Sequence, residues 1–276
     1  MNRSIMLKKL PRAIGFVFAL LLIVSSSFAS DKKGVGVADL KAADRVAALN
    51  VTWYYTWKPQ PIDGAPDKKF VPMVWGGNRL DKNISDVRAK GKVPLLLAIN
   101  EPNMTDQANM SVEETIRRWP EIRQLAEKIS SPVTAGGALG PWFENFYNMA
   151  AARNLKFDFI AVHLYTPPDA DKFLAKIDAM YEKYHMPIWI TEFAVADWEA
   201  SKKKCKASCE NRFSEDDVLA FMKIVLPELE KRPFVQRYAW FGAGKASLDH
   251  EAVRTSRLFE KNGSLTPLGR FYSQFQ

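Results

Sequence analysis

The feature that most constrains the fold is a regular alternation of short apolar segments with longer amphipathic stretches. Short apolar runs rich in β-branched and aromatic side chains are typical of buried strands, and a spacing of three to four is typical of helices. Eight segments are expected to be strands: 34–37, 51–57, 70–75, 93–99, 133–138, 159–165, 188–192 and 235–241. Helices are expected at Ser111–Ile129, Trp142–Asn154, Ala170–Tyr184 and Asp216–Lys231, with a last one opening at Thr266 and Pro267. This order favours an α/β fold with a single (β/α)8 TIM barrel.

The N-terminus has the pattern of a targeting segment. Four basic residues precede an uncharged apolar run from Ala13 to Val24, and Ser27-Phe28-Ala29 places small residues at both recognition positions of a signal peptidase. The alternative is an uncleaved anchor, for which the run is short. We expect a signal peptide over 1–29, one catalytic domain over 30–276, and a secreted or periplasmic protein that does not stay on the membrane.

Charge and composition exclude several classes of protein. Removal of the four basic residues of the leader leaves 35 Lys and Arg against 31 Asp and Glu, a net charge of +4. No basic block with interleaved aromatic residues is present, so nucleic acid is not an expected partner. The chain also lacks a phosphate-binding glycine loop, and its three histidines lie in separate segments. We therefore expect no cofactor, no metal site, and a monomer.

The two cysteines, Cys205 and Cys209, lie in one lysine-rich loop. In an exported chain this spacing favours a local disulfide, and two free thiols are the alternative. A zinc site is disfavoured because no histidine lies nearby and two thiolates do not complete a zinc shell.

Two apolar runs end in a glutamate, namely the segment from Leu95 to Glu101 and the segment from Ile188 to Glu192. Glycosidic cleavage by double displacement requires one carboxyl group that protonates the leaving oxygen and a second that attacks the anomeric carbon. By the strand count, both glutamates lie at the carboxyl end of the barrel, where active sites of this fold are built. Glu101 is the expected general acid/base and Glu192 the expected nucleophile.

A period of two would place Glu101 in one row with Leu97 and Ile99, and Glu192 in one row with Ile188 and Ile190. Asn100 would then point to the opposite face. For Asn100 to share the site with Glu101, the strand must bend or bulge before Pro102.

Four segments carry a resemblance to a known family: Ala98-Ile99-Asn100-Glu101-Pro102-Asn103, Val162-His163-Leu164-Tyr165, Trp189-Ile190-Thr191-Glu192-Phe193 and Tyr238-Ala239-Trp240-Phe241. Over 34–271 the chain resembles glycoside hydrolase family 128, the Asl1-like catalytic domain. The resemblance implies endo-hydrolysis of β-1,3-glucan with retention of configuration. It also implies that Asn100 bonds the sugar 2-hydroxyl.

His163 and Tyr165 lie two residues apart and should face the same way. Tyr165 is expected to donate to the nucleophile or the sugar. His163 is expected to bond a hydroxyl or tune a neighbouring carboxylate, and the alternative for it is a satisfied histidine in the core.

Aromatic side chains are expected to stack on the apolar faces of sugar rings. Trp75 and Trp240 lie nearest to strand ends, and Trp240 is the expected platform at the reacting sugar. The other candidates are Trp53, Tyr55 and Trp142. Some of these aromatic side chains must fill the barrel, and Trp142 could equally pack at a helix start.

Two other functions remain open from the sequence. The chain could hydrolyse another β-linked glycan, or it could be a non-catalytic barrel that binds β-glucan. Chain-length preference and the choice between endo and exo action depend on the loop that begins at Asp197, which no motif assigns.

Overall fold

The computed structural model describes residues 1, 30–39, 42–65, 69–201, 205, 210–244 and 250–276. The signal peptide expected over 1–29 lies outside this part of the chain, apart from Met1. No helix within these ranges is long and apolar enough to cross a lipid bilayer.

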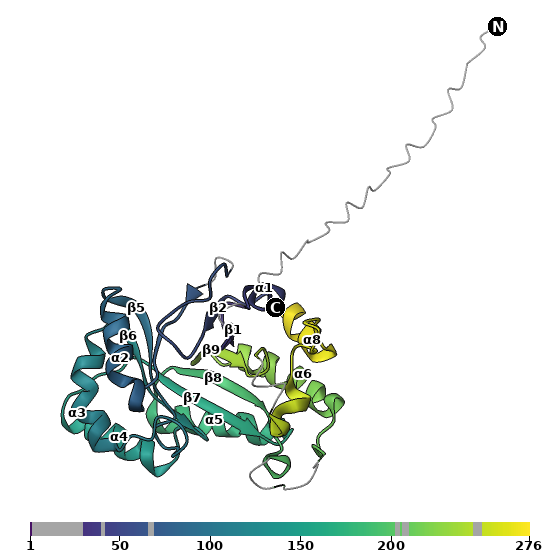
Figure 1. Ribbon diagram of the computed structural model, residues 1–276. Helices are drawn as coiled ribbons and strands as arrows, with labels where there is room; N and C mark the ends of the chain where they lie inside the picture. Colours follow the sequence, from purple (N-terminus) through teal and green to yellow (C-terminus); the bar gives the residue numbers. More distant parts are fainter. Residues whose placement is uncertain (2–29, 40–41, 66–68, 202–204, 206–209, 245–249) are drawn as a thin grey trace.

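The strands form one parallel sheet that curves into a barrel (Figure 1). In spatial order the sheet runs β3-β2-β1-β9-β8-β7-β6-β5-β4, and all of its strand pairs are parallel. The short segments β3 and β4 are consecutive in the chain; β3 pairs with β2 and β4 pairs with β5, so together they act as the third barrel strand. The expected (β/α)8 barrel is confirmed. The strand bounds are β1 (Lys33–Gly36), β2 (Trp53–Tyr55), β3 (Lys69–Phe70), β4 (Met73–Val74), β5 (Val93–Asn100), β6 (Ala126–Ala135), β7 (Ile160–Thr166), β8 (Ile188–Val195) and β9 (Val235–Trp240).

Helices cover the outside of the barrel (Figure 1). Their bounds are α1 (Ala43–Ala48), α2 (Leu80–Arg88), α3 (Val112–Arg123), α4 (Pro141–Ala152), α5 (Ala170–Tyr184), α6 (Glu215–Lys231) and α8 (Pro267–Gln274), with 3-10 turns η1 (Gly77–Arg79), η2 (Trp198–Ala200) and η3 (Glu251–Ser256). The expected start at Ser111 is found, since its hydroxyl accepts the Glu114 N–H at 3.1 Å. Thr266 caps α8 in the same way, with Pro267 at the first helical position.

The expected boundary between the helix at Ser111 and the following strand is wrong. The helix α3 ends at Arg123, and the chain enters β6 at Ala126, seven residues before the expected Val133. Apolar residues continue at helical spacing through Ile122 and Leu125 to Ile129. Parallel pairing with β5, which sets Val93 opposite Ala126, overrides that local pattern.

The core has an inner part and an outer part. Side chains from most of the strands fill the barrel interior, among them Trp53, Tyr55, Leu97 and Trp189, together with Phe159 just before β7. Two larger clusters lie between the sheet and the helices, one under α5, α6 and α8 and the other under α2, α3 and α4. These inner side chains fill the barrel toward the amino ends of the strands, so the polar groups of a site must lie at the carboxyl ends.

A buried lysine joins the first strand to the last helix. Lys33 is fully buried, and its ammonium group donates to the carbonyl oxygens of Tyr272 at 2.8 Å, Ser273 at 3.3 Å, and Phe275. Carbonyls at a helix C-terminus have no partner within the helix, and a cation there also offsets the helix dipole. Lys33 therefore fixes α8 against the barrel.

We expect Lys33→Met to lower the free energy of unfolding by about 2 to 4 kcal/mol, because it leaves buried carbonyls without a donor. Urea unfolding followed by circular dichroism measures the change. Lys82→Met is the matched control: the Lys82 side chain is 76% exposed in a surface pair with Asp86, so a loss of about 0.5 kcal/mol or less is expected. Equal losses in the two variants would contradict the role given to Lys33.

Candidate active site

An irregularity in the backbone of β5 directs the Glu101 side chain toward the site. Ile99 and Glu101 have positive φ angles of 52° and 44°, and the pairing with β6 shifts register on both sides of Ala98. Positive φ is strained, most of all for a β-branched residue such as Ile99. Ile99 consequently packs with Leu96 in the outer cluster. The expected row through Leu97, Ile99 and Glu101 is wrong, whereas the bulge required by Asn100 is present.

A second irregularity, a register shift in β8, directs the Glu192 side chain toward the same site. Ile188 and Ile190 lie in the outer cluster, and Phe193 joins them three residues later. The pairing of β8 with β9 shifts register between Ile190 and Phe193. The expected row through Ile188, Ile190 and Glu192 is therefore also wrong, because an irregularity at the strand end places Glu192 away from that face.

His163 on β7 connects the two glutamates. Its Nδ1 lies 2.8 Å from Glu101 Oε1, and its Nε2 lies 3.1 Å from Glu192 Oε1. The first contact is a hydrogen bond; the second is close but poorly aligned, so Nε2 forms no hydrogen bond. One carboxylate oxygen of Glu101, one oxygen of Glu192 and one ring nitrogen of His163 all lie within 4.8 Å of one another. The imidazole thus touches both carboxyl groups with different ring nitrogens.

Three aromatic side chains hold Glu192. Trp57 Nε1 donates to Oε1 at 2.6 Å, and the Tyr165 hydroxyl donates to Oε2. The Tyr55 hydroxyl lies 3.2 Å from Oε1 and 3.0 Å from the Thr191 carbonyl oxygen, so its single proton is shared between two acceptors. Both carboxylate oxygens therefore have donors.

Burial and charge shift the pKa values of these groups. Burial raises the pKa of Glu192, and the neighbouring charge of Glu101 raises it further, while His163, Tyr165 and Trp57 oppose the rise. Burial disfavours the imidazolium form of His163, but Glu192 and Glu101 outweigh it, and the pKa of His163 is raised. Burial and the charge of Glu192 raise the pKa values of Tyr55 and Tyr165 well above 10, so both phenols remain donors.

Asn100 is buried beside Glu101 at the end of β5. Its Nδ2 donates to Gln107 Oε1 at 3.2 Å, while its buried Oδ1 has no hydrogen-bond partner among the described residues. Burying a polar atom without a partner is costly, and active sites are where such atoms are retained. Asn100 therefore offers an unused polar group close to the glutamates.

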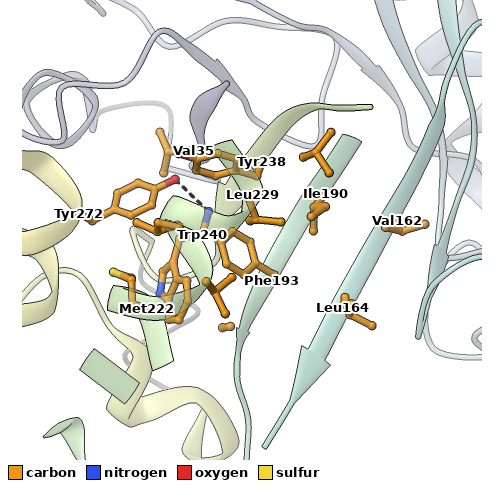
Figure 2. Packing of buried hydrophobic residues seen from close by; sticks show 14 of the residues in the cluster. Val35, Val162, Leu164, Ile190, Phe193, Met222, Leu229, Tyr238, Trp240 and Tyr272 are labelled. Atoms are coloured by element: carbon orange, nitrogen blue, oxygen red, sulfur yellow. Dashed lines mark hydrogen bonds between the residues drawn. The ribbon is translucent and has the colours of Figure 1, made fainter. Parts of the chain in front are cut away.

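The expected role of Trp240 is wrong. Its side chain is fully buried, its indole N–H donates to the Ser256 carbonyl oxygen at 2.8 Å, and its ring meets Phe193 at a centroid distance of 4.9 Å. Figure 2 shows it packed in the outer core near Met222 and Tyr272, and the Tyr272 hydroxyl lies 3.3 Å from its backbone nitrogen. On β9 it is Ala239 that faces the barrel interior. Trp240 cannot reach a sugar there.

The other expected sugar platforms divide into interior and rim residues. Trp53 is buried near the start of β2, and its indole N–H donates to the Lys32 carbonyl oxygen at 2.9 Å, which excludes contact with substrate. Tyr55 is also buried and contacts Glu192 instead of offering a free ring face. Trp75 is partly exposed, with the Arg79 guanidinium 4.6 Å from its ring centroid. Trp142 stacks on Phe146 and donates to the Met110 carbonyl oxygen at 3.0 Å, as a helix-packing role requires.

Glu101, His163 and Glu192 also have a spacing that a metal ion could use, and no other group of this kind is found in the described part of the chain. Each glutamate faces a different nitrogen of His163, so a single ion could not use both imidazole contacts. The arrangement of Glu101, His163 and Glu192 is better described as two carboxyl groups bridged by an imidazole than as the ligands of one metal ion.

The sequence reasoning missed two residues of the site. Trp57 is the last residue of the segment 51–57 expected to be a strand and is not among the expected site residues; in the structure it follows β2 and has a φ of 56°. Gln107 carried no signal, because it lies in a loop and meets Asn100 only in the folded chain. The place of Trp57 at the carboxyl end of the expected strand 51–57 was the available signal.

The loop after β8 is fixed at its base by an ion pair. Asp197 is buried and accepts hydrogen bonds from the Arg212 backbone N–H and guanidinium, both at 2.9 Å. These bonds lower the pKa of Asp197 to about 2. Farther along the loop, Cys205 is disulfide-bonded. Cys209 lies outside the described residues, so their pairing remains a prediction.

We expect Asp197→Asn to cost about 1 to 2 kcal/mol of unfolding free energy at pH 7, the lower figure reflecting the exposed guanidinium of Arg212. The folded-state pKa of Asp197 lies below its unfolded value, so its contribution is present above about pH 4 and disappears as the pH falls toward about 2. Urea unfolding at several pH values measures this. Asp81→Asn, whose side chain is 86% exposed, should change stability little throughout.

Comparison with known proteins identifies the family. A family model described as a glycosyl hydrolase catalytic core matches residues 34–272. The crystal structure of a family 128, subgroup I endo-β-1,3-glucanase from Amycolatopsis mediterranei, in complex with laminaritriose, superposes with a TM-score of 0.74; it is 31% identical and the match covers 88% of this chain and 99% of that one. The chain belongs to glycoside hydrolase family 128. It is therefore a glycoside hydrolase.

Two further proteins are similar to this chain at comparable levels of identity. The subgroup II endo-β-1,3-glucanase from Pseudomonas viridiflava is 29% identical, with a TM-score of 0.68 and coverage of 90% of this chain and 98% of that one. Alkali-sensitive linkage protein 1 from Schizosaccharomyces pombe is 27% identical over 261 residues, which are 89% of this chain. The match spans 45% of that curated relative, so this chain corresponds to less than half of it.

Proposed function

We propose that this protein is an exported endo-β-1,3-glucanase that acts with retention of configuration, with Glu192 as nucleophile and Glu101 as general acid/base. Support for the substrate comes from the Amycolatopsis mediterranei relative, which was solved with laminaritriose and with laminaripentaose. The solved forms of that enzyme include variants at two of its glutamates. The subgroup I and II relatives are endo-β-1,3-glucanases, whereas a subgroup III relative from Blastomyces gilchristii is an exo-β-1,3-glucanase.

The observation that carries the retaining mechanism is the short distance between the two carboxyl groups. One oxygen of Glu101 and one of Glu192 lie within 4.8 Å of each other. Retaining glycosidases separate their carboxyl groups by about 5 to 5.5 Å, while inverting enzymes leave about 6.5 Å or more for a water molecule. A nearest approach within 4.8 Å leaves less room for a water molecule than an inverting site has, which favours direct attack by a carboxylate.

In the first step, a Glu192 oxygen forms a bond to the anomeric carbon as the glycosidic bond breaks. Glu101 transfers its proton to the departing oxygen, so the leaving chain departs as a neutral alcohol. The loss of charge on Glu192 during attack is opposed by its donors, but the same donors fix the direction of its lone pairs. The hydrogen bonds from Tyr55, Trp57 and Tyr165 thus lower the nucleophilicity of Glu192 somewhat but hold its carboxylate in position for attack.

In the second step, the Glu101 carboxylate removes a proton from water, and the water oxygen displaces Glu192 from the anomeric carbon. The carboxylate that leaves regains negative charge, which the N–H of Trp57 and the phenol of Tyr165 stabilise. His163 can stay bonded to Glu101 in both protonation states, because its Nδ1 can donate to a carboxylate or accept from a carboxylic acid. Asn100, with its unpartnered oxygen, would bond the 2-hydroxyl of the reacting sugar.

Incubation of the leaderless protein with soluble β-1,3-glucan, mixed-linkage glucan and β-1,4-glucan tests the proposal. We expect reducing ends and short oligosaccharides from β-1,3-glucan, and proton NMR should show the β-anomer as the first product. Glu101→Gln and Glu192→Gln should release nothing detectable, whereas Glu113→Gln on the exposed face of α3 should retain full activity.

Each other outcome has a distinct meaning. Equal rates on all three glucans would reject the β-1,3 linkage preference and favour a hydrolase of another β-linked glycan. Release of the α-anomer first would reject retention. Binding of β-1,3-oligosaccharides without any hydrolysis would identify a non-catalytic glucan-binding barrel.

A further inference from the structure

Two exposed apolar side chains lie in the loops that follow the two glutamates. Among the described residues after Met1, the large apolar side chains with marked exposure are Met104, Trp198 and Ile224. Met104 lies three residues after Glu101, and Trp198 lies six residues after Glu192. Ile224 lies on α6, outside the barrel. Scattered exposed apolar residues are ordinary, but these two are in the loops that leave the catalytic strands.

Trp198 lies close to the proposed nucleophile. Its ring centroid is 5.7 Å from that of Tyr165, with the planes at 73°, and the Tyr165 hydroxyl bonds Glu192. Its ring centroid also lies 5.8 Å from that of His250, with the planes at 90°. Both neighbours meet the indole nearly perpendicular to its plane, and 43% of the residue remains exposed. Part of the indole is thus open to solvent, one aromatic ring away from the carboxylate.

The backbone around Trp198 is firmly held. Asp197 is buried and bonds Arg212, and its backbone N–H donates to the Ala252 carbonyl oxygen at 2.8 Å. Asp197 Oδ1 also accepts from the Glu199 N–H at 3.2 Å, which fixes the turn η2. Ala200 at the end of that turn is buried. A side chain on a fixed turn loses little conformational entropy when a ligand stacks on it.

We propose that Trp198 is a stacking platform for the glucosyl unit adjacent to the one that Glu192 attacks. The apolar C–H face of a pyranose ring would lie on the exposed face of the indole, and the sugar hydroxyls would remain at the ring edge, in contact with water or polar groups. The inference rests on the proposed glucanase function. It adds a residue that would set the chain length of the substrate and the size of the products.

The test compares Trp198→Ala, Trp198→Phe and the control Ile224→Ala on laminari-oligosaccharides of three to six sugar units. For Trp198→Ala we expect KM to rise about tenfold for the longer oligosaccharides, with kcat nearly unchanged. Trp198→Phe keeps an aromatic face and should recover most of this loss. Ile224→Ala removes another exposed apolar side chain, on α6 outside the barrel, and should leave KM unchanged.

Binding is measured separately from turnover. In the Glu192→Gln background, calorimetric titration with laminarihexaose should show a Kd about tenfold higher when Trp198→Ala is added. Thermal unfolding of each variant checks that the loop remains folded, and Trp198→Phe carries the comparison if the alanine variant is unstable.

Two results would overturn the platform alone. The first is an unchanged KM and Kd at every chain length. The second is an equal fall in kcat for all chain lengths with KM unchanged, which would mean that Trp198 only supports Tyr165. If the unmodified protein neither cleaves nor binds laminari-oligosaccharides, the glucanase function and the platform are both rejected.

Discussion

Glu192→Ala is expected to lower kcat on β-1,3-glucan by on the order of 10⁵-fold, because it removes the atom that forms the glycosyl-enzyme bond. The vacated space should admit a small anion. With a 2,4-dinitrophenyl laminaribioside as substrate, added azide is expected to restore turnover by attacking the anomeric carbon from the side that Glu192 occupied. The product should be the α-glycosyl azide, which carbon NMR or chromatography against a standard identifies.

Glu113→Ala is the matched control, since it removes a carboxylate from the exposed face of α3 and leaves the site unchanged. It should show full activity and no response to azide. A β-glycosyl azide from Glu192→Ala would contradict the assignment, since it would mean that a nucleophile still acts on that face. Retention of more than about a tenth of the original kcat would exclude a covalent role for Glu192.

The sequence was sufficient for the barrel and for the positions of both glutamates. Strand-ending carboxyl groups at Glu101 and Glu192 needed only the βα alternation and the rule that barrel sites form at the carboxyl ends of strands. The direction of these side chains was not predictable from a period of two. Positive φ at Ile99 and the register shift before Phe193 reverse the alternation at the point where the chemistry would occur.

Depth within the barrel explains most of the errors among the aromatic residues. Trp53, Tyr55 and Trp57 form one column of neighbouring rings, with centroid distances of 6.0 Å and 4.7 Å. Their alternation predicts one shared face, but only height along the strand separates a core residue from a site residue. Trp53 starts β2 and fills the interior, whereas Trp57 follows the strand and bonds Glu192.

Trp240 shows a different limit of sequence reasoning. Its strand carries large residues at Tyr238 and Trp240 with a small one, Ala239, between them. The larger pair would be a natural choice for the inner face. The interior is already occupied by Trp53, Tyr55 and Trp189 from other strands, so only Ala239 fits there and the larger side chains face the helices. That competition for volume involves several strands and cannot be seen in any one of them.

Glu101→Ala is expected to affect substrates according to how much their leaving group needs a proton. On β-1,3-glucan, kcat/KM should fall by about 10³- to 10⁴-fold, because the sugar alkoxide cannot depart without protonation. On the 2,4-dinitrophenyl laminaribioside, the first step should be nearly unchanged, since dinitrophenolate leaves without a proton. The second step then becomes limiting, because no base activates water, and a rapid initial burst of dinitrophenolate should precede slow turnover.

Azide should accelerate that slow turnover in Glu101→Ala and yield the β-glycosyl azide, the opposite anomer to that expected from Glu192→Ala. The two products together distinguish the roles of the two glutamates. His163 bonds Glu101 and touches Glu192, so loss of Glu101 also removes a partner of the imidazole. Glu101→Gln keeps a polar partner there while it still cannot transfer a proton. If Glu101→Gln lowered kcat/KM equally for β-1,3-glucan and for the 2,4-dinitrophenyl laminaribioside, Glu101 would position the site instead of transferring a proton.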